Sequence, residues 1–210
     1  MKDSVFFDLD GTLTDPKIGI TSSIQYALEK FGIDVPEKDE LTWCIGPPLL
    51  GSLGDLVGDE HASKALRYYR ERFADVGWHE NSLYPGISET LAILVDSGLS
   101  LYVATSKPFV YAKRIIDHFD MGQYFREIFG SELDGAKSSK DDLLRFALLE
   151  TRSTGASIMI GDRKHDVLGA LNNNMRAIGV TYGYGSLEEL KKAGAHEIVD
   201  QPEDLLPLLL

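Results

Sequence analysis

The residues best suited to chemistry stand near the start of the chain, in SVFFDLDGTLTD (residues 4–15). Asp8 and Asp10 follow an apolar run that is typical of a strand buried on both faces. In an extended backbone, alternate side chains point to the same face, so these two carboxylates would lie close together beside the core. Such crowding of negative charge costs free energy unless a positive group lies there. The stretch therefore predicts a site that holds a cation.

Two later apolar stretches also end in polar residues. Thr105 and Ser106 follow LSLYVA, while Asp162 follows SIMIG, with Asp166 four residues further on. Three or four acids at one point suit a hard cation with oxygen ligands, Mg²⁺ above all, which also takes substrate phosphate as a ligand. The predicted metal-binding residues are the four acids at these strand ends, Asp8, Asp10, Asp162 and Asp166.

A carboxylate can also act as a covalent nucleophile, as it does in aspartyl-phosphate intermediates. Phosphoryl transfer then needs hydroxyl or cationic groups around the phosphoryl oxygens. The hydroxyls of Thr105 and Ser106 are candidates, and either Lys137 or Lys140 in LDGAKSSK would supply the cation. Cys44 has no histidine near it in the sequence, so we expect no thiol nucleophile.

Hydrophobic periodicity indicates the elements that would position these groups. Residues 16–82 show helical spacing, whereas from residue 85 onward apolar strands alternate with helices. We expect an α/β fold: a Rossmann-like parallel-sheet core (residues 1–15 and 83–210) with an inserted helical cap domain (residues 16–82). Because ligands bind beyond the carboxyl ends of the strands in such sheets, the three polar strand ends would converge on one site.

Composition limits the classes of function. The chain has 210 residues, of which 43% are hydrophobic and 26% charged, and a formal net charge of −12 argues against a general nucleic-acid binder. No apolar stretch reaches the length of a membrane span, the N-terminus lacks the layout of a secretory signal, and one cysteine allows no internal disulfide. We therefore expect a cytoplasmic protein that binds neither a nucleic acid nor a membrane. The acids, hydroxyls and lysine named above make a small phosphorylated metabolite the expected partner.

Four stretches carry a resemblance to a known family. In chain order, FDLDGTLTD, VATSKP, the lysine of SSKDDLL and IGDRKHDVLGA resemble the four motifs of the haloacid dehalogenase superfamily. The tail GVTYGYGSLEELKKAGAHEIVD and the loop IGPPL resemble the phosphoglycolate-phosphatase-like branch of that superfamily. The resemblance covers essentially the whole chain, and it implies a Mg²⁺-dependent phosphatase with an α/β core and a helical cap.

The resemblance also implies a role for each matched residue. Asp8 would attack phosphorus, while Asp10 would first protonate the leaving oxygen and then activate water. The Asp8 carboxylate, the Asp10 carbonyl and Asp162 would hold Mg²⁺, and Asp166 would orient this cluster or reach the metal through water. The implied catalytic residues are Asp8, Asp10, Thr105 and Lys140. The implied phosphate-binding residues are Gly11, Thr105, Ser106 and Lys140, the last favoured over Lys137 because it opens the following helix.

Simpler interpretations of single residues stay open. Gly11 and Thr12 would equally form a capped turn, and Thr105 with Ser106 would cap the helix that starts near Pro108. We expect surface or supporting positions for Arg163, Lys164 and His165, and packing positions for His118, Trp43 and Trp78.

Several functions compete with phosphoglycolate hydrolysis. The alternatives are a 5′-nucleotidase, a phosphomutase of the same fold and an inactive binding module. Asp10 argues against a dehalogenase, because relatives of that type lack the second acid of the first motif. Selectivity would come from the cap, around Gly46, Pro47 and Pro48. A carboxylate on the substrate would need a cation such as Lys17 or Arg67, and a nucleobase would want an aromatic surface such as Trp43 or Tyr68.

Overall fold

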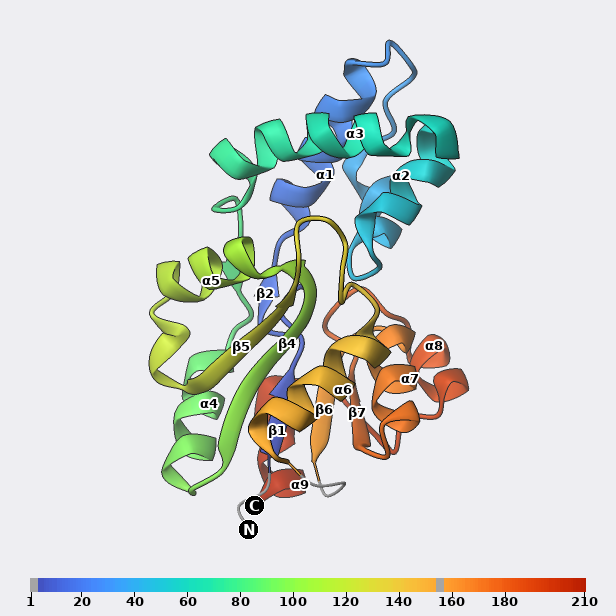
Figure 1. The fold of residues 1–210 in the computed structure, drawn as a ribbon. Coiled ribbons are helices and arrows are strands. Elements are labelled where there is room, and N and C mark those ends of the chain that lie inside the picture. Colours follow the sequence, from blue (N-terminus) through green and yellow to red (C-terminus); the bar gives the residue numbers. More distant parts are fainter. Residues whose placement is uncertain (1–3, 154–156) are drawn as a thin grey trace.

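The computed structural model describes residues 4–153 and 157–210 (Figure 1). Its centre is a six-stranded sheet in the order β5-β4-β1-β6-β7-β8, in which every neighbouring pair is parallel. This arrangement confirms the predicted α/β, Rossmann-like fold class. The strands are β1 (Ser4–Phe7), β4 (Ser100–Pro108), β5 (Phe125–Ser131), β6 (Ile158–Gly161), β7 (Arg176–Val180) and β8 (Glu197–Val199).

Strand β1 lies in the middle of the sheet and is buried on both faces. Val5 and Phe7 belong to the hydrophobic cluster on one face, and Phe6 belongs to the cluster on the other. This alternation follows from the period of two in a strand, and burial on both faces explains why the run is continuously apolar.

Helices cover each face of the sheet. On one side lie α4 (Ile87–Asp96), α5 (Phe109–His118) and the C-terminal α9 (Leu206–Leu209), which contribute to the same cluster as Val5. On the other side lie α6 (Lys140–Thr151), α7 (Lys164–Asn172) and α8 (Leu187–Ala193). Among the described residues, no helix combines the length and the apolar character that a membrane span requires.

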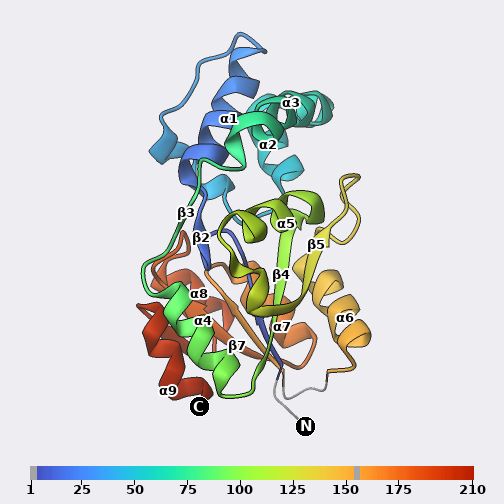
Figure 2. The same ribbon diagram turned by 90° about the vertical axis from the view of Figure 1, so that its left-hand side faces the viewer.

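A helical unit stands above the carboxyl ends of the strands (Figures 1 and 2). It has its own hydrophobic cluster, which includes Ile24, Leu53 and Phe73. A short antiparallel pair, β2 (Thr14–Asp15) with β3 (Ser82–Leu83), joins it to the sheet; strands of two residues carry no periodic pattern, so the sequence did not predict them. The unit consists of α1 (Lys17–Glu29), the 3₁₀ helix Lys38–Cys44, α2 (Leu49–Val57), α3 (Asp59–Arg72) and the π-helical turn Phe73–Gly77.

The predicted packing residues behave differently from one another. Trp43 is 42% exposed, so its predicted packing role is wrong. Trp78 does pack, since the ring of His118 lies edge-on at 5.6 Å from it and the guanidinium of Arg114 lies 4.1 Å from its ring centroid.

Candidate active site

The carboxyl ends of the adjacent strands β4, β1 and β6 bring the predicted polar residues together. Asp8 directly follows β1, and its N–H donates a hydrogen bond to the carbonyl of Ile160 in β6 at 2.9 Å. Asp162 directly follows β6, and Thr105 lies in the last part of β4. Neighbouring parallel strands end at one edge of the sheet, and residues far apart in sequence meet there.

Asp8, Asp162 and Asp166 form a buried carboxylate cluster. One carboxylate oxygen of each lies within 4.8 Å of the others. Burial raises the pKa of Asp162 well above its ordinary value, and the charges of Asp166 and Asp8 raise it further. Burial also raises the pKa of Asp166, to about 6, although Lys140 opposes this effect. The cluster therefore favours a proton or a cation over three unscreened charges.

Lys140 is the cation at the centre of this cluster. It begins α6, and its Nζ lies 2.9 Å from Asp8 Oδ1 and 2.7 Å from Asp166 Oδ1 while donating a hydrogen bond to the carbonyl of Ala104 at 2.8 Å. Burial alone would lower the pKa of Lys140, but Asp166 and Asp8 outweigh it and raise the pKa. Lys137 lies elsewhere, 3.6 Å from Glu132, so geometry favours Lys140 over the alternative lysine.

The cluster fits a divalent cation. Asp162 Oδ1 is buried and has no hydrogen-bond partner among the described residues, whereas Asp162 Oδ2 accepts the N–H of Tyr184 at 2.8 Å. Three carboxylates also exceed the single positive charge of Lys140. Oxygen-only ligands suit a hard ion such as Mg²⁺ better than a soft one. Gly11 allows the close approach, since its φ is +86° and a Cβ there would lie 2.3 Å from Asp162 Oδ2.

Asp10 has a cationic partner that the sequence analysis missed. Lys107 Nζ lies 2.6 Å from Asp10 Oδ2, with the two side chains 5% and 10% exposed. Burial raises the pKa of Asp10, and the ion pair with Lys107 opposes this rise. The signal was present in VATSKP, because a buried acid needs a cation and this lysine follows the polar end of a strand. The carboxylate of Asp10 thus faces Lys107 and stands apart from the three clustered acids.

The predicted phosphate-binding residues lie at the same edge. Thr105 and Ser106 line the cavity described below, and Thr105 Oγ1 accepts the N–H of Lys107 at 3.2 Å instead of capping a helix. The N–H of Gly11 already donates to the carbonyl of Thr14 at 2.8 Å. A role for Gly11 in phosphate binding stays a prediction.

Arg163, expected at the surface or in support of the site, is 9% exposed. Its Nε lies 3.0 Å from Glu189 Oε1, and its Nη1 donates a hydrogen bond to the carbonyl of Ile45 in the helical unit. Periodicity could not reveal this contact, because the residues it joins are 118 positions apart.

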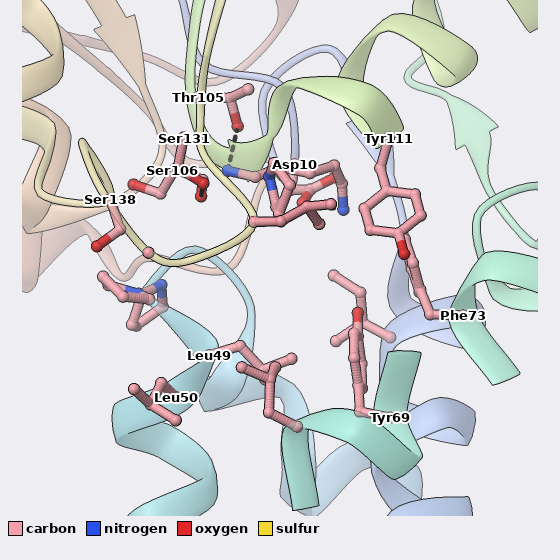
Figure 3. Close-up of a pocket in the computed structure, with 18 of the residues that line it drawn as sticks. Asp10, Leu49, Leu50, Tyr69, Phe73, Thr105, Ser106, Tyr111, Ser131 and Ser138 are labelled. Atoms are coloured by element: carbon pink, nitrogen blue, oxygen red, sulfur yellow. Dashed lines mark hydrogen bonds and ion pairs between the residues drawn. The ribbon is translucent and has the colours of Figure 1, made fainter. Parts of the chain in front are cut away.

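A cavity of about 390 Å³ lies between the sheet edge and the helical unit (Figure 3). Its floor includes Asp8 and Asp10. One wall is aromatic: the rings of Tyr69 and Phe73 stack at 5.2 Å, and Tyr111 meets Phe73 edge-on at 5.2 Å. Figure 3 shows the hydroxyl groups of Ser106, Ser131 and Ser138 on the opposite side.

The predicted selectivity residues divide into two groups. Gly46, Pro47 and Pro48 line the cavity, as expected. The aromatic residues of the wall are not the predicted pair, because Trp43 is exposed and the ring of Tyr68 packs on Phe31. The four candidates that do not line the cavity are Lys17, Arg67, Trp43 and Tyr68.

Comparison with known proteins decides the family. The sequence model of the haloacid dehalogenase-like hydrolase family matches residues 5–180 of this chain. This chain belongs to that family. A 5′-nucleotidase of Pseudomonas aeruginosa is 47% identical over 209 residues, which cover 98% of this chain and 93% of the relative. The crystal structure of a predicted phosphatase from Clostridium acetobutylicum superposes with a TM-score of 0.96 at 47% identity, covering 100% of this chain and 98% of that one.

Other relatives within the family carry different names. Tyrosine-protein kinase PtkA of Mycobacterium tuberculosis is 42% identical over 90% of this chain, which spans 65% of that relative. Phosphoglycolate phosphatase 1 of Pseudomonas aeruginosa is 30% identical over 97% of this chain and 78% of the relative. The predicted superfamily and enzyme class are confirmed: the protein is a phosphatase of the haloacid dehalogenase-like type. The names of these relatives imply different substrates, so similarity alone does not identify the substrate of this protein.

Proposed function

We propose that this protein is a Mg²⁺-dependent phosphomonoesterase that hydrolyses nucleoside 5′-monophosphates through a phospho-enzyme on Asp8. The observation that carries the proposal is the position of Asp8, which belongs to the carboxylate cluster, lies 2.9 Å from Lys140 Nζ and also lines the cavity. We further propose that residues 16–82 act as a cap, the name used below for the helical unit.

In the first step, a carboxylate oxygen of Asp8 forms a bond to phosphorus as the bond from phosphorus to the leaving oxygen breaks. Asp10 donates a proton to that oxygen, so that the product leaves as a neutral alcohol. The ammonium of Lys140 and the hydroxyl of Thr105 would stabilise charge on the phosphoryl oxygens. Mg²⁺, held by Asp8, Asp162 and the Asp10 carbonyl with Asp166 in support, would supply further positive charge there.

In the second step, water attacks the phosphorus of the phospho-enzyme, and the bond to Asp8 breaks. Asp10 accepts the proton of this water, so it returns to its starting state and inorganic phosphate is released. Lys107 contacts only Oδ2 of Asp10 and would hold this carboxyl group at the cavity floor, while Oδ1 gives up the proton in the first step and accepts it in the second. The cap would exclude bulk water during the first step.

The charges around the cavity favour a leaving group without a carboxylate. Among the described residues that line it, the cationic ones are Arg70 and Lys107, and both have partners. Arg70 donates to the carbonyl of Leu133 at 2.6 Å, and Lys107 pairs with Asp10. Glu132 and Asp134 also line the cavity, so the carboxylate of phosphoglycolate would lose its hydration and face two further acids. Among the described lining residues, it would find Arg70 as the one cation that no acid pairs with.

The aromatic wall supports a nucleobase. Tyr69, Phe73 and Tyr111 form one aromatic side of the cavity (Figure 3). Phe73 is only 2% exposed, so the rings of the two tyrosines would offer the surface for stacking. Stacking on aromatic side chains stabilises a bound base by about 1–3 kcal/mol. The serine hydroxyls on the opposite side suit the hydroxyl groups of a ribose.

A panel of phosphate esters tests the proposal. With Mg²⁺ present, we expect kcat/KM for the best nucleoside 5′-monophosphate to exceed that for phosphoglycolate by about tenfold or more, the equivalent of one lost polar contact. Free phosphate and nucleoside should form in equal amounts, and EDTA should abolish turnover until Mg²⁺ is restored. A preference for phosphoglycolate would refute the nucleotide assignment, and phosphate retained on an organic product would identify a mutase.

A further inference from the structure

Arg163 connects the carboxylate cluster to the cap. In the sequence it lies between Asp162 and Asp166, and its N–H donates to Asp166 Oδ2 at 3.0 Å. Its side chain leaves the core and donates, through Nη1, to the carbonyl of Ile45 in the cap. The backbone of this buried residue thus contacts the carboxylate cluster, while its side chain contacts the cap loop at Ile45.

Residues of both the cap and the core favour the contact between Arg163 and the Ile45 carbonyl. On the cap side, Gly46 has a φ of +103°, and a Cβ there would lie 2.7 Å from Arg163 Cγ, so only glycine admits this approach. On the core side, Glu189 accepts from Arg163 Nε at 3.0 Å and from the N–H of Lys164 at 2.8 Å, which holds the guanidinium in place. An arginine fork that is fixed at one edge by a carboxylate loses little entropy when its other edge binds a carbonyl.

Two other arginines also form hydrogen bonds between the cap and the core, and they can be compared with Arg163. Arg70 donates to the carbonyl of Leu133 at 2.6 Å, and Arg114 donates to the carbonyl of Ala74 at 3.1 Å. Both contacts are exposed to solvent. The Arg163 contact is buried, and it holds the loop whose next residues, Pro47 and Pro48, line the cavity.

We propose that Arg163 is a positioning residue that closes the cap loop at residues 45–48 over the active site. The closed loop completes the cavity, so a substrate that fills the cavity and the Arg163 contact both favour the closed state and strengthen each other. A very small phosphorylated compound, such as acetyl phosphate, reaches Asp8 without touching the loop, so its binding gains nothing from closure. The choice of a nucleotide as the large substrate rests on the proposed function; the closure of the loop does not.

The kinetic test compares a large and a small substrate. For Arg163→Ala, we expect kcat/KM for a nucleoside monophosphate to fall about 10- to 100-fold, chiefly through KM, with acetyl phosphate hydrolysis retained within about threefold. Arg114→Ala, the matched control, should change neither by more than about threefold. Equal losses on both substrates in Arg163→Ala would overturn the proposal, because they would place the defect in the core.

The second test measures the loop itself and needs no substrate. In hydrogen exchange, the segment 41–52 of Arg163→Ala should exchange about tenfold faster than in the parent protein, with and without Mg²⁺, and Arg114→Ala should leave it unchanged. Gly46→Ala approaches the same contact from the cap. It should also speed exchange. In the double variant with Arg163→Ala, the part of this increase that comes from the clash should disappear, while the part that comes from the strained φ of residue 46 should remain. Unchanged exchange in both single variants would refute the closure even if nucleotides prove not to be substrates.

Discussion

On the sheet side of the cavity, the side chains of Asp8, Asp10, Lys107 and Lys140 are charged and almost completely excluded from water. On the cap side, the wall around Tyr69 is aromatic and apolar. Removing one buried charge leaves its partner unpaired at a cost of several kcal/mol, whereas trimming an apolar wall removes contact area only. Substitutions on the sheet side should therefore cause large losses of activity on every substrate. Substitutions on the cap side should cause smaller losses that depend on the substrate.

The largest expected effect is on the nucleophile. Asp8→Asn should lower kcat for every ester by roughly 10⁴-fold or more, because an amide cannot form the acyl phosphate. The thermal midpoint and the circular dichroism spectrum should stay close to those of the parent, because Lys140 keeps its ion pair with Asp166 when Asp8 is replaced. Asp96→Asn on the exposed end of α4 serves as the control. Residual activity above about one per cent would remove Asp8 from the mechanism.

Lys140 tests the pairing of charges on the sheet side. Lys140→Met leaves Asp8 and Asp166 without their common cation, so we expect a loss of about 3–5 kcal/mol in the free energy of unfolding at pH 7 without metal. The matched variant Lys137→Met removes a partly exposed charge and should cost less than about 0.5 kcal/mol. Urea denaturation measures both, and equal costs would contradict the difference drawn between the two lysines.

A variant of the aromatic wall should behave in the opposite way. Tyr69→Leu, in α3 of the cap, keeps an apolar side chain but removes the ring stacked on Phe73, so KM for a nucleotide should rise about tenfold while kcat changes less than about threefold. Acetyl phosphate kinetics and Tyr124→Leu, a tyrosine outside the cavity, provide the controls. If kcat fell as much for acetyl phosphate as for the nucleotide, the division between the two sides would not hold.

The smallest effect concerns pH. The folded state raises the pKa values of Asp162 and Asp166, so it binds more protons than the unfolded chain between pH 4 and the raised values, which include about 6 for Asp166. Stability without metal should therefore fall as pH rises through this window, with a midpoint shift of a few degrees (~4 °C per kcal/mol), and Mg²⁺ should restore it at pH 7.5.

The control for this experiment is Asp162→Asn, which should flatten the pH dependence and weaken the response to Mg²⁺. Burial lowers the pKa of His165, which contributes a slope of the opposite sign in both proteins and cancels in the difference between them. Calorimetric scans across the pH range measure that difference. If the stability of the parent protein depended on pH no more steeply than that of Asp162→Asn, the cluster would not bind more protons in the folded state than in the unfolded chain.

Several features were predictable because they depend on local order. Asp8, Thr105 and Asp162 each end an apolar strand, and parallel strands place those ends at one edge whatever the connections between them. Lys140 was preferred to Lys137 because it opens a helix, and that helix delivers its ammonium into the cluster. Gly46, Pro47 and Pro48 were expected at the cavity because they lie in the cap loop IGPPL, which resembles that of the family.

By itself, the sequence determined the fold class and the strand ends at which Asp8, Asp162 and Asp166 meet, because periodicity and chain direction are local properties. The tertiary structure alone decided that Lys107 pairs with Asp10, that Arg163 reaches the cap and that the rings of Tyr69, Phe73 and Tyr111 form one wall. Each of these depends on where a long side chain points across a boundary between elements distant in sequence. That direction is set by packing, and no spacing of residues along the chain encodes it.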